Sequence, residues 1–290
     1  MSGRTSLLYA RVERLGFRTL YRLADLTYAL CVATPKRTVA GSYWSYEPTN
    51  PHGDDPGLAA LDRLPDDAVI LDVGAHVGEH AIPLARDTDR RVIAFEPNGE
   101  SADRLARNAE RNDLGDRIDL RRAGVGDANA TLPFYRSTFS KCSAFDRESA
   151  TRWGASVAGT ESVPVRRLDD LVEGVGGSGP TEGVGVPPPD AIKVDVEGRE
   201  AAVLRGVAGA IAAHRPLLVV EVHDADSVVD GGETTDSATG DSAAGDSATG
   251  DSAAGDAADL REWLRARGYA VEDAEDVWIC RPTKEPKSRD

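Results

Sequence analysis

The stretch from residue 68 to residue 96 constrains the fold more than any other part of the chain. It begins with the apolar run 69–73 (VILDV) and turns through residues 74–78 (GAHVG). Residues 79–86 then have helical composition, and residues 91–96 return as a second apolar run. Short apolar runs that end at a turn are typical of strands buried on both faces of a parallel sheet. The stretch therefore predicts a βαβ unit.

The turn indicates which ligand this unit binds. Gly74 and Gly78 allow the backbone to turn sharply and to pass close to a bound molecule. The dinucleotide-binding pattern G-x-G-x-x-G needs a third glycine, which this turn lacks. Asp72 and Glu79 would repel a pyrophosphate, whereas they suit a ligand that carries an ammonium and a sulfonium. We therefore predict S-adenosylmethionine as the cofactor; the alternative is an ordinary tight turn in another kind of α/β protein.

Acidic side chains close the later strands as well. Glu96 ends the run 91–96, where it can accept hydrogen bonds from both hydroxyls of a ribose. Ligands of open α/β sheets bind outside the carboxyl ends of the strands. We expect the following side chains to gather at that edge: Asp72, Glu96, Asp195, Glu197, Glu221 and His223. The predicted fold is α/β, a doubly wound and mostly parallel Rossmann-like sheet with an N-terminal helical extension.

Residues 118–123 predict a third strand. Two segments that follow it, 124–127 and 137–159, are expected near the carboxyl edge of the sheet. The turn at 124–127 puts Asp127 where it can contact the adenine of the cofactor, and an exposed turn without that role fits equally well. Residues 137–159 are polar and rich in small side chains. Inserts at this edge commonly face the substrate; the alternative is a surface excursion without a role.

Five sequence blocks together resemble the FkbM family of S-adenosylmethionine-dependent methyltransferases. They are residues 72–78 (DVGAHVG), 95–97 (FEP), 168–171 (LDDL), 192–200 (IKVDVEGRE) and 220–223 (VEVH). The resemblance implies the class I methyltransferase fold and O-methylation of natural products or sugars. It also implies that Gly74, Ala75, Gly78 and Glu96 hold the cofactor. The acceptor side is then lined by the 192–200 block, and we place Lys193, Glu197 and Glu221 there.

The reaction that these residues suit is a direct in-line displacement. The acceptor oxygen attacks the methyl carbon, and alignment of the two reactants supplies most of the catalysis. A hydroxyl acceptor of a sugar, a lipid-linked molecule or a small molecule must also lose its proton. His223 is the predicted base because imidazole titrates near neutrality, and Asp195 is its rival. An alternative use of Asp195, Glu221 and His223 is a magnesium site similar to that of catechol O-methyltransferase-like enzymes.

The charge of the chain limits its partners. Its 290 residues carry a formal net charge of -15, and its basic residues are nearly all arginine. Such a surface is typical of halophilic proteins, because high salt screens the self-repulsion. Nucleic acid is thereby excluded as a general partner, and a small-molecule or glycan acceptor is expected. Cys31, Cys142 and Cys280 have no metal-ligand or disulfide spacing, so we expect buried thiols in the cytoplasm.

The N-terminal part of the chain is net positive, opposite in sign to the chain as a whole. Residues 6–34 predict a basic amphipathic helix, with arginines between apolar side chains at helical spacing. Its apolar stripe comprises Leu8, Val12, Leu15, Leu23, Leu26 and Leu30. This stripe can pack on its own domain or on a twin subunit of an oligomer, or it can lie peripherally on the inner membrane surface.

We expect two parts in the chain. Residues 1–50 hold the N-terminal helix and a connection, and residues 51–285 hold the methyltransferase domain. Within that domain the motifs span 66–225, a disordered acidic insert of five-residue repeats spans 226–256, and a final helix and strand pair span 257–281. Residues 34–65 predict an irregular connection.

Two other functions fit parts of the sequence. A nicotinamide-dependent oxidoreductase would use the same βαβ unit, but Asp72, Glu79 and the missing third glycine disfavour it. A non-catalytic module would use the N-terminal helix to sit on membranes or partners.

Overall fold

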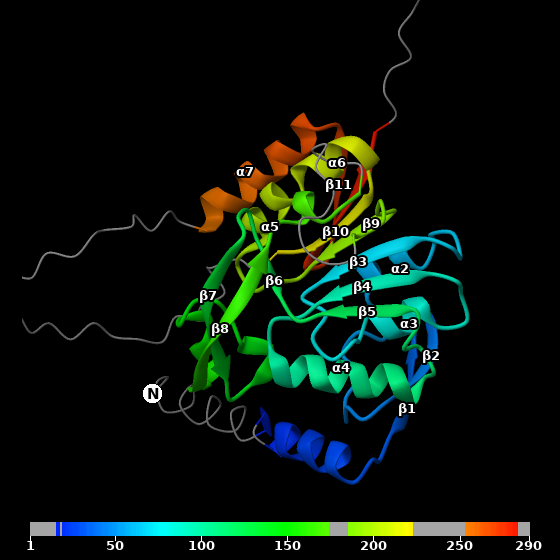
Figure 1. Ribbon diagram of the computed structural model, residues 1–290, viewed down its shortest axis with the longest axis vertical. Coiled ribbons are helices and arrows are strands. Elements are labelled where there is room, and N and C mark those ends of the chain that lie inside the picture. The colour runs from blue at the N-terminus through cyan, green and yellow to red at the C-terminus, as the bar shows by residue number, and fades with distance from the viewer. Residues whose placement is uncertain (1–15, 18, 174–184, 223–252, 284–290) are drawn as a thin grey trace, which may run out of the picture.

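The computed structural model describes residues 16–17, 19–173, 185–222 and 253–283, with side chains in the last range from residue 258 onward. At its centre lies a seven-stranded sheet in the order β11-β12-β10-β9-β3-β4-β5 (Figure 1). The strands are β3 (Val69–Val73), β4 (Arg91–Phe95), β5 (Ile118–Arg121), β9 (Ala191–Val194), β10 (Leu217–Glu221), β11 (Tyr269–Ala274) and β12 (Val277–Pro282). Only the pairs that involve β12 are antiparallel. The predicted doubly wound, mostly parallel α/β sheet is confirmed.

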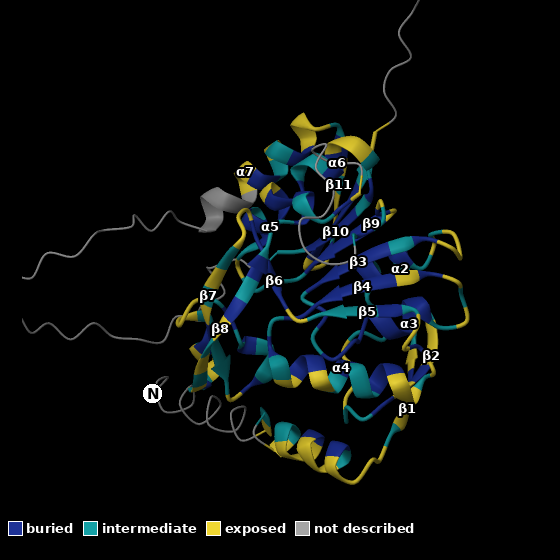
Figure 2. Ribbon diagram, viewed as in Figure 1, coloured by how far each residue is buried: buried dark blue, intermediate teal, exposed yellow. Residues whose placement is uncertain are grey.

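Helices cover both faces of this sheet, which explains why its central strands are mostly apolar, with Asp72 and Lys193 as buried charged exceptions. Ile70 packs on the face covered by α2 (Pro56–Leu61), α3 (Ala81–Ala85) and α4 (Gly99–Arg111). Leu71, the next residue, packs on the face covered by α5 (Glu200–Gly206), α6 (Ala208–His214) and α7 (Ala253–Ala266). Successive side chains of a strand point to opposite faces, so the strands of a doubly covered sheet are apolar at nearly every position. Figure 2 shows the buried central strands and the exposed outer sides of the helices.

The order of the strands reverses between β3 and β9. The chain passes from β3 to β4 and β5 on one side, and it later returns to β9 and β10 on the other side of β3. Connections then leave the carboxyl ends of two adjacent strands in opposite directions, which opens a crevice between them. This point in the topology positions the candidate site.

A smaller sheet stands at the carboxyl edge of the main one (Figure 1). In it, β8 (Val157–Arg166) pairs antiparallel with β7 (Ala130–Ser137) and parallel with β6 (Gly124–Val125). The expectation of a mere turn at 124–127 was wrong for its first two residues. A Cβ at Gly124 would lie 2.5 Å from the Phe145 ring, so the absence of a side chain at Gly124 lets β6 and Phe145 lie close together. Three 3-10 segments, η1 (Ser140–Cys142), η2 (Ser149–Gly154) and η3 (Leu168–Asp170), complete the region.

The N-terminal helix is described over residues 16–17 and 19–29. It packs on its own domain through aromatic rings, because Phe17 and Tyr21 contact Phe139, and Asn108 Nδ2 donates to Tyr28 Oη at 2.7 Å. The leucine stripe is exposed at Leu23, Leu26 and Leu30, so packing of these three residues on their own domain was the wrong alternative, while Leu8, Val12 and Leu15 lie outside the described residues. Aromatic side chains, with their larger apolar area, occupy the inner face instead. Packing of the stripe on a twin subunit or on a membrane surface stays a prediction.

Residues 34–65 are more regular than predicted. They contain a hairpin of β1 (Thr34–Thr38) and β2 (Gly41–Ser45), followed by α2. Tyr43 is buried among residues of α3 and α4, and the Trp44 N–H donates to Asn112 Oδ1 at 2.8 Å. The hairpin therefore packs against the main domain, and an irregular connection was the wrong expectation. The division of the chain at residue 50 stays a prediction.

Three further expectations can be compared with the structure. The helix expected over 199–213 is split into α5 and α6 at Val207. The last helix begins at Ala253, earlier than the expected residue 257, and the rest of the acidic repeat lies outside the described residues. Cys142 and Cys280 are buried as expected, whereas Cys31 is exposed because its place in the turn after the N-terminal helix leaves it uncovered. Within the described ranges, no helix has the length and apolar character needed to cross a bilayer.

Candidate active site

Two glycines fix the loop that follows β3. Gly74 has a φ of +83° and Gly78 a φ of +90°. A Cβ at Gly74 would lie 1.7 Å from the carbonyl oxygen of Asp195, and one at Gly78 would lie 2.9 Å from Ile82 Cδ1. The space that a side chain at either glycine would occupy is therefore filled by other atoms of the protein, and not by a ligand as the sequence analysis expected. The approach of Gly74 to Asp195 joins this loop and the end of β9 in one wall.

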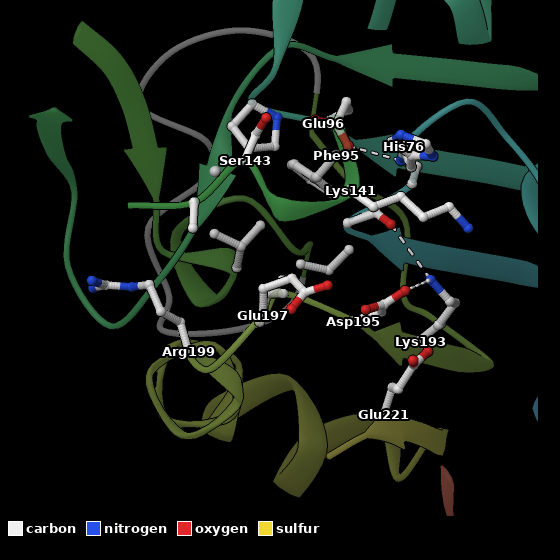
Figure 3. A pocket seen from close by; sticks show the side chains of 18 of the residues that line it. His76, Phe95, Glu96, Lys141, Ser143, Lys193, Asp195, Glu197, Arg199 and Glu221 are labelled. Carbon is white, nitrogen blue, oxygen red and sulfur yellow. Dashed lines mark hydrogen bonds and ion pairs between the residues drawn. The ribbon is translucent and has the colours of Figure 1, made fainter. Parts of the chain in front are cut away.

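Backbone groups hold Glu96 at the end of β4. The His76 N–H donates to Oε2 of Glu96, and the Asn98 N–H donates to Oε1, both at 2.7 Å. Burial raises the pKa of Glu96, and these donors with the His76 ring act against that rise. Each oxygen has two acceptor sites, so each can still accept a bond from a bound hydroxyl. Figure 3 shows Glu96 and His76 on the same side of the cavity.

Lys193 is buried on β9 between two carboxylates. Its Nζ lies 3.3 Å from Oδ1 of Asp72 on the adjacent strand and 3.3 Å from Oδ2 of Asp195. Burial alone would lower the pKa of Lys193, but Asp72, Asp195 and Glu221 outweigh it and raise that pKa. Lys193 is thus a fixed cation that neutralises the buried Asp72. A magnesium ion at Asp195 and Glu221 would have to compete with this ammonium.

Glu79 also faces a cation of the protein. Its Oε2 lies 3.0 Å from the Lys141 Nζ. Burial would raise the pKa of Glu79, but Lys141 and His52 outweigh it and hold that pKa well below its usual value. The two carboxylates that the sequence assigned to a cationic ligand, Asp72 and Glu79, therefore each have a lysine beside them. The lining nevertheless holds more carboxylates than lysine and arginine side chains, so the cavity keeps an acidic character.

Two histidines meet at one oxygen of Asp55, just before α2. His52 Nδ1 and His80 Nε2 each lie 3.2 Å from Asp55 Oδ2. Burial would lower the pKa of His52, but Asp55 and Glu79 raise it to about 9. Burial, with the nearby charge of Lys193, lowers the pKa of His80. Burial would raise the pKa of Asp55, but the two histidines hold it well below its usual value.

The insert at residues 137–159 forms the opposing wall. Ser140, Lys141, Ser143, Arg152 and Trp153 all line the cavity, so this insert faces the site. The His76 Nε2 lies 2.9 Å from Ser140 Oγ. Arg152 forms an ion pair with Glu197. The Arg199 guanidinium lies 5.6 Å from the centre of the Phe145 ring.

These walls enclose a cavity of about 540 Å³. Asp195, Glu197 and Glu221 lie on one side of it, and Glu96 and His76 lie on the other (Figure 3). The predicted site residues in its lining are Gly74, Ala75, Glu96, Lys193, Asp195, Glu197 and Glu221.

Three predicted site residues lie outside the lining, and a fourth lies outside the described residues. Asp72, on β3, and Gly78, at the end of the loop that follows it, are the first two. Asp127 also lies outside the lining and pairs with Arg205 at 3.4 Å; its contact with adenine stays a prediction. His223, the predicted base and metal ligand, lies outside the described residues.

The sequence analysis missed His52, Asp55 and His80. His52 and Asp55 fall in the stretch taken for an irregular connection, and no local spacing links them to His80. The only signal was His80 itself, which follows Glu79 directly after the glycine turn.

Comparisons with known proteins match this chain to methyltransferases. The family model of the FkbM methyltransferase domain matches residues 72–271. The hexuronic acid methyltransferase AglP of Haloferax volcanii is 32% identical over 163 residues, which cover 56% of this chain and 59% of that protein. The methyltransferase sdnD of Sordaria araneosa is 28% identical over 162 residues, which cover 50% of this chain and 62% of that protein. The match thus spans less than two thirds of either relative.

Solved structures give a weaker match. The crystal structure of methyltransferase FkbM from Methylobacillus flagellatus KT is 22% identical, with a TM-score of 0.37. The alignment covers 55% of this chain and 34% of that one.

Proposed function

The chain belongs to the FkbM family of methyltransferases, and we propose that it transfers the methyl group of S-adenosylmethionine to a hydroxyl of an acidic sugar. The observation that supports this most is Glu96, a buried carboxylate that two backbone N–H groups hold on the cavity wall. The cofactor, when bound, supplies a methyl group activated on a sulfonium, which an acceptor oxygen can displace in line.

The chain's own residues suit such a cofactor. Glu96 would accept hydrogen bonds from the ribose hydroxyls, since each of its oxygens keeps an acceptor site. Gly74 and Ala75 would line the cofactor side through the backbone of the β3 loop. The excess of carboxylates in the lining favours a ligand with positive charge over a pyrophosphate. The same charges disfavour a nicotinamide dinucleotide.

We place the acceptor on the side of Asp195, Glu197 and Glu221. Lys193 holds the Asp195 carboxylate in place. Among the residues that the structure describes, Asp195 is therefore the candidate for the base that takes the proton of the acceptor hydroxyl. His223 keeps the same proposed role from the sequence. Alignment of the hydroxyl in this partly enclosed cavity would supply most of the rate.

The proposal of an acidic sugar rests on Arg199. This side chain lines the cavity, and no carboxylate among the described residues forms an ion pair with it. An arginine binds a carboxylate in a bidentate manner, so Arg199 suits the acid group of a uronic acid. The relative AglP is named a hexuronic acid methyltransferase, and a hexuronic acid belongs to the same class of substrate as the acidic sugar proposed here.

A lipid-linked sugar is a second candidate acceptor. Leu23, Leu26 and Leu30 are exposed on the N-terminal helix and could lie on the inner membrane surface beside the cavity's insert. Flotation of the purified protein with anionic vesicles would support this candidate, and recovery in the vesicle-free fraction would remove it.

Calorimetric titration tests the cofactor first. We expect binding of S-adenosylhomocysteine and no binding of NAD, and the reverse would favour an oxidoreductase. Methyl-labelled cofactor is then incubated with glucuronic acid glycosides and with matched glucosides. Label in the acidic acceptors supports the proposal, and binding without any transfer across a panel of fractionated glycans and lipids would favour a non-catalytic module.

A further inference from the structure

Three side chains converge in the cavity wall at a point that the proposed function leaves unused. The Nδ1 of His52 and the Nε2 of His80 each lie 3.2 Å from Asp55 Oδ2. One ligand atom from each of these residues lies within 4.8 Å of both others. In a tetrahedral site with metal bonds of about 2.0 Å, neighbouring ligand atoms are about 3.3 Å apart. Two of the three separations already have nearly this value, and rotation of an imidazole can shorten the third.

The surroundings of these ligand atoms also match a metal site. Ligating histidines usually donate their other ring N–H to a carboxylate, and ligating carboxylates are themselves hydrogen-bonded. Glu79 Oε2 lies 3.5 Å from His52 Nε2. Asp55 Oδ1 accepts the Leu58 N–H at 2.7 Å, which leaves Oδ2 for an ion. Outer partners of His52 and Asp55 are therefore in place, although Lys141 Nζ lies 3.5 Å from the same His52 Nε2 and would have to move away from it when an ion binds.

We propose that His52, Asp55 and His80 form a binding site for one first-row divalent transition-metal ion, such as Zn²⁺ or Co²⁺. Two imidazole nitrogens with one carboxylate favour these ions over Mg²⁺, which prefers oxygen ligands. His52 and His80 line the cavity, so the remaining coordination positions of the ion would open toward it. The site is distinct from the Asp195, Glu221 and His223 set.

The ion would have a role in methyl transfer. A metal-bound hydroxyl has a lowered pKa, and a bound oxygen has a fixed position. We infer that the ion holds an oxygen of the acceptor beside Lys193 and Asp195. This role rests on the proposed function, whereas the metal site itself does not.

Titration of the chelator-treated full-length protein with Co²⁺ tests the site without cofactor or acceptor. We expect one ion per chain and the intense visible absorption of four- or five-coordinate Co²⁺. His52→Gln removes a ligand whose side chain is 21% exposed, and Asp55→Asn keeps an oxygen that can cap α2. Each variant should weaken binding by more than about 100-fold, and Glu79→Gln by about 10- to 100-fold.

His214→Gln is the matched control, because His214 lies on α6 away from the cavity lining and should bind Co²⁺ as the unaltered protein does. Circular dichroism establishes that each variant is folded. Equal binding by the unaltered protein and His52→Gln, no stoichiometric binding by the folded protein, or a thiolate absorption band that assigns the ion to a cysteine would each overturn the proposal. Failure of methyl transfer alone would remove the proposed function and with it the role of the ion, but not the metal site.

Discussion

The ammonium nitrogen of Lys193 lies 3.3 Å from Oδ1 of Asp72 and 3.3 Å from Oδ2 of Asp195. Asp72 is its partner in register on β3, and Asp195 follows it by two residues on the same face. Lys193 Nζ also lies 3.5 Å from the carbonyl oxygen of Gly74. One buried cation thus ties the β3 loop to the end of β9.

Replacement of Lys193 should therefore destabilise the fold. Lys193→Met leaves Asp72 buried without an opposite charge, and removal of one partner of a buried ion pair costs about 3–5 kcal/mol. Chemical denaturation followed by circular dichroism measures this loss. The double variant Lys193→Met, Asp72→Asn should recover more than half of it. A loss below about 1 kcal/mol would show that the pair is not held as described.

Glu96→Gln should weaken cofactor binding while leaving the fold intact. The glutamine keeps one acceptor oxygen, but its NH₂ group would face either the His76 N–H or the Asn98 N–H. Hydrogen bonds to a charged group contribute about 1.5–3 kcal/mol, so the affinity for S-adenosylhomocysteine should fall about 10- to 100-fold. Calorimetry measures this change.

Asp127→Asn belongs in the same experiment. Asp127 lies outside the cavity lining, so its removal should leave the affinity unchanged. A loss comparable to that of Glu96→Gln would instead support the adenine contact predicted from the sequence.

Arg199→Gln should change specificity rather than turnover in general. If Arg199 binds the carboxylate of the acceptor, KM for a uronic acid glycoside should rise about 10- to 100-fold, because a charge-assisted bidentate contact is lost. KM for the matched neutral glycoside should stay the same. Steady-state assays with both acceptors measure the difference, and an equal effect on the two would contradict a role in acid recognition.

Much of the fold could be predicted because its signals are local. The apolar runs at 69–73 and 191–194 mark buried strands, and Gly74 marks the turn between strand and helix. The ion pairs of the site could not be predicted in the same way. Lys193 and Lys141 lie far along the chain from Asp72 and Glu79, so only the packing of β9 and the insert shows that each carboxylate has a lysine beside it.

The orientation of the N-terminal helix also could not be predicted from local sequence patterns. Leucine spacing predicted a packing stripe, but helical spacing alone does not say which of two apolar faces turns inward. The face that carries Tyr28 turns inward, where Asn108 on α4 donates a hydrogen bond to the Tyr28 hydroxyl. The contact depends on a residue that no local pattern could link to the helix.

The stability of the chain should rise with salt concentration. A net charge of -15 makes the compact state repel itself, and the screening length falls from about 10 Å at 0.1 M salt to about 3 Å at 1 M. Between 0.1 M and 2 M KCl we expect the Tm to rise by about 5 °C or more, which corresponds to roughly 3 kcal/mol for a chain of 290 residues. Scanning calorimetry measures it, with equal-osmolality sucrose as the control. A Tm that KCl leaves unchanged would contradict the halophilic character.

Thiol reactivity should separate the three cysteines. Burial raises the pKa of Cys142 and of Cys280 to about 12, so near pH 8 only about one in ten thousand of each is a thiolate, the form that reacts. Cys31 is exposed, so a thiol reagent should modify this one cysteine in the native protein and all three after unfolding. Mass spectrometry of peptides identifies the labelled positions.

The same reagent can detect opening of the cavity's insert. Cys142 is buried in a small cluster with Phe139, and Phe17 and Tyr21 of the N-terminal helix cover that cluster. Tyr21→Ala removes a ring that stacks on Phe139 at 5.3 Å, so it should expose Cys142 and speed its labelling. Cys280 lies in the main sheet and serves as the internal control. Faster labelling of Cys142 alone would mean that the N-terminal helix holds the insert closed, whereas equal acceleration at both thiols would indicate global unfolding and contradict this coupling.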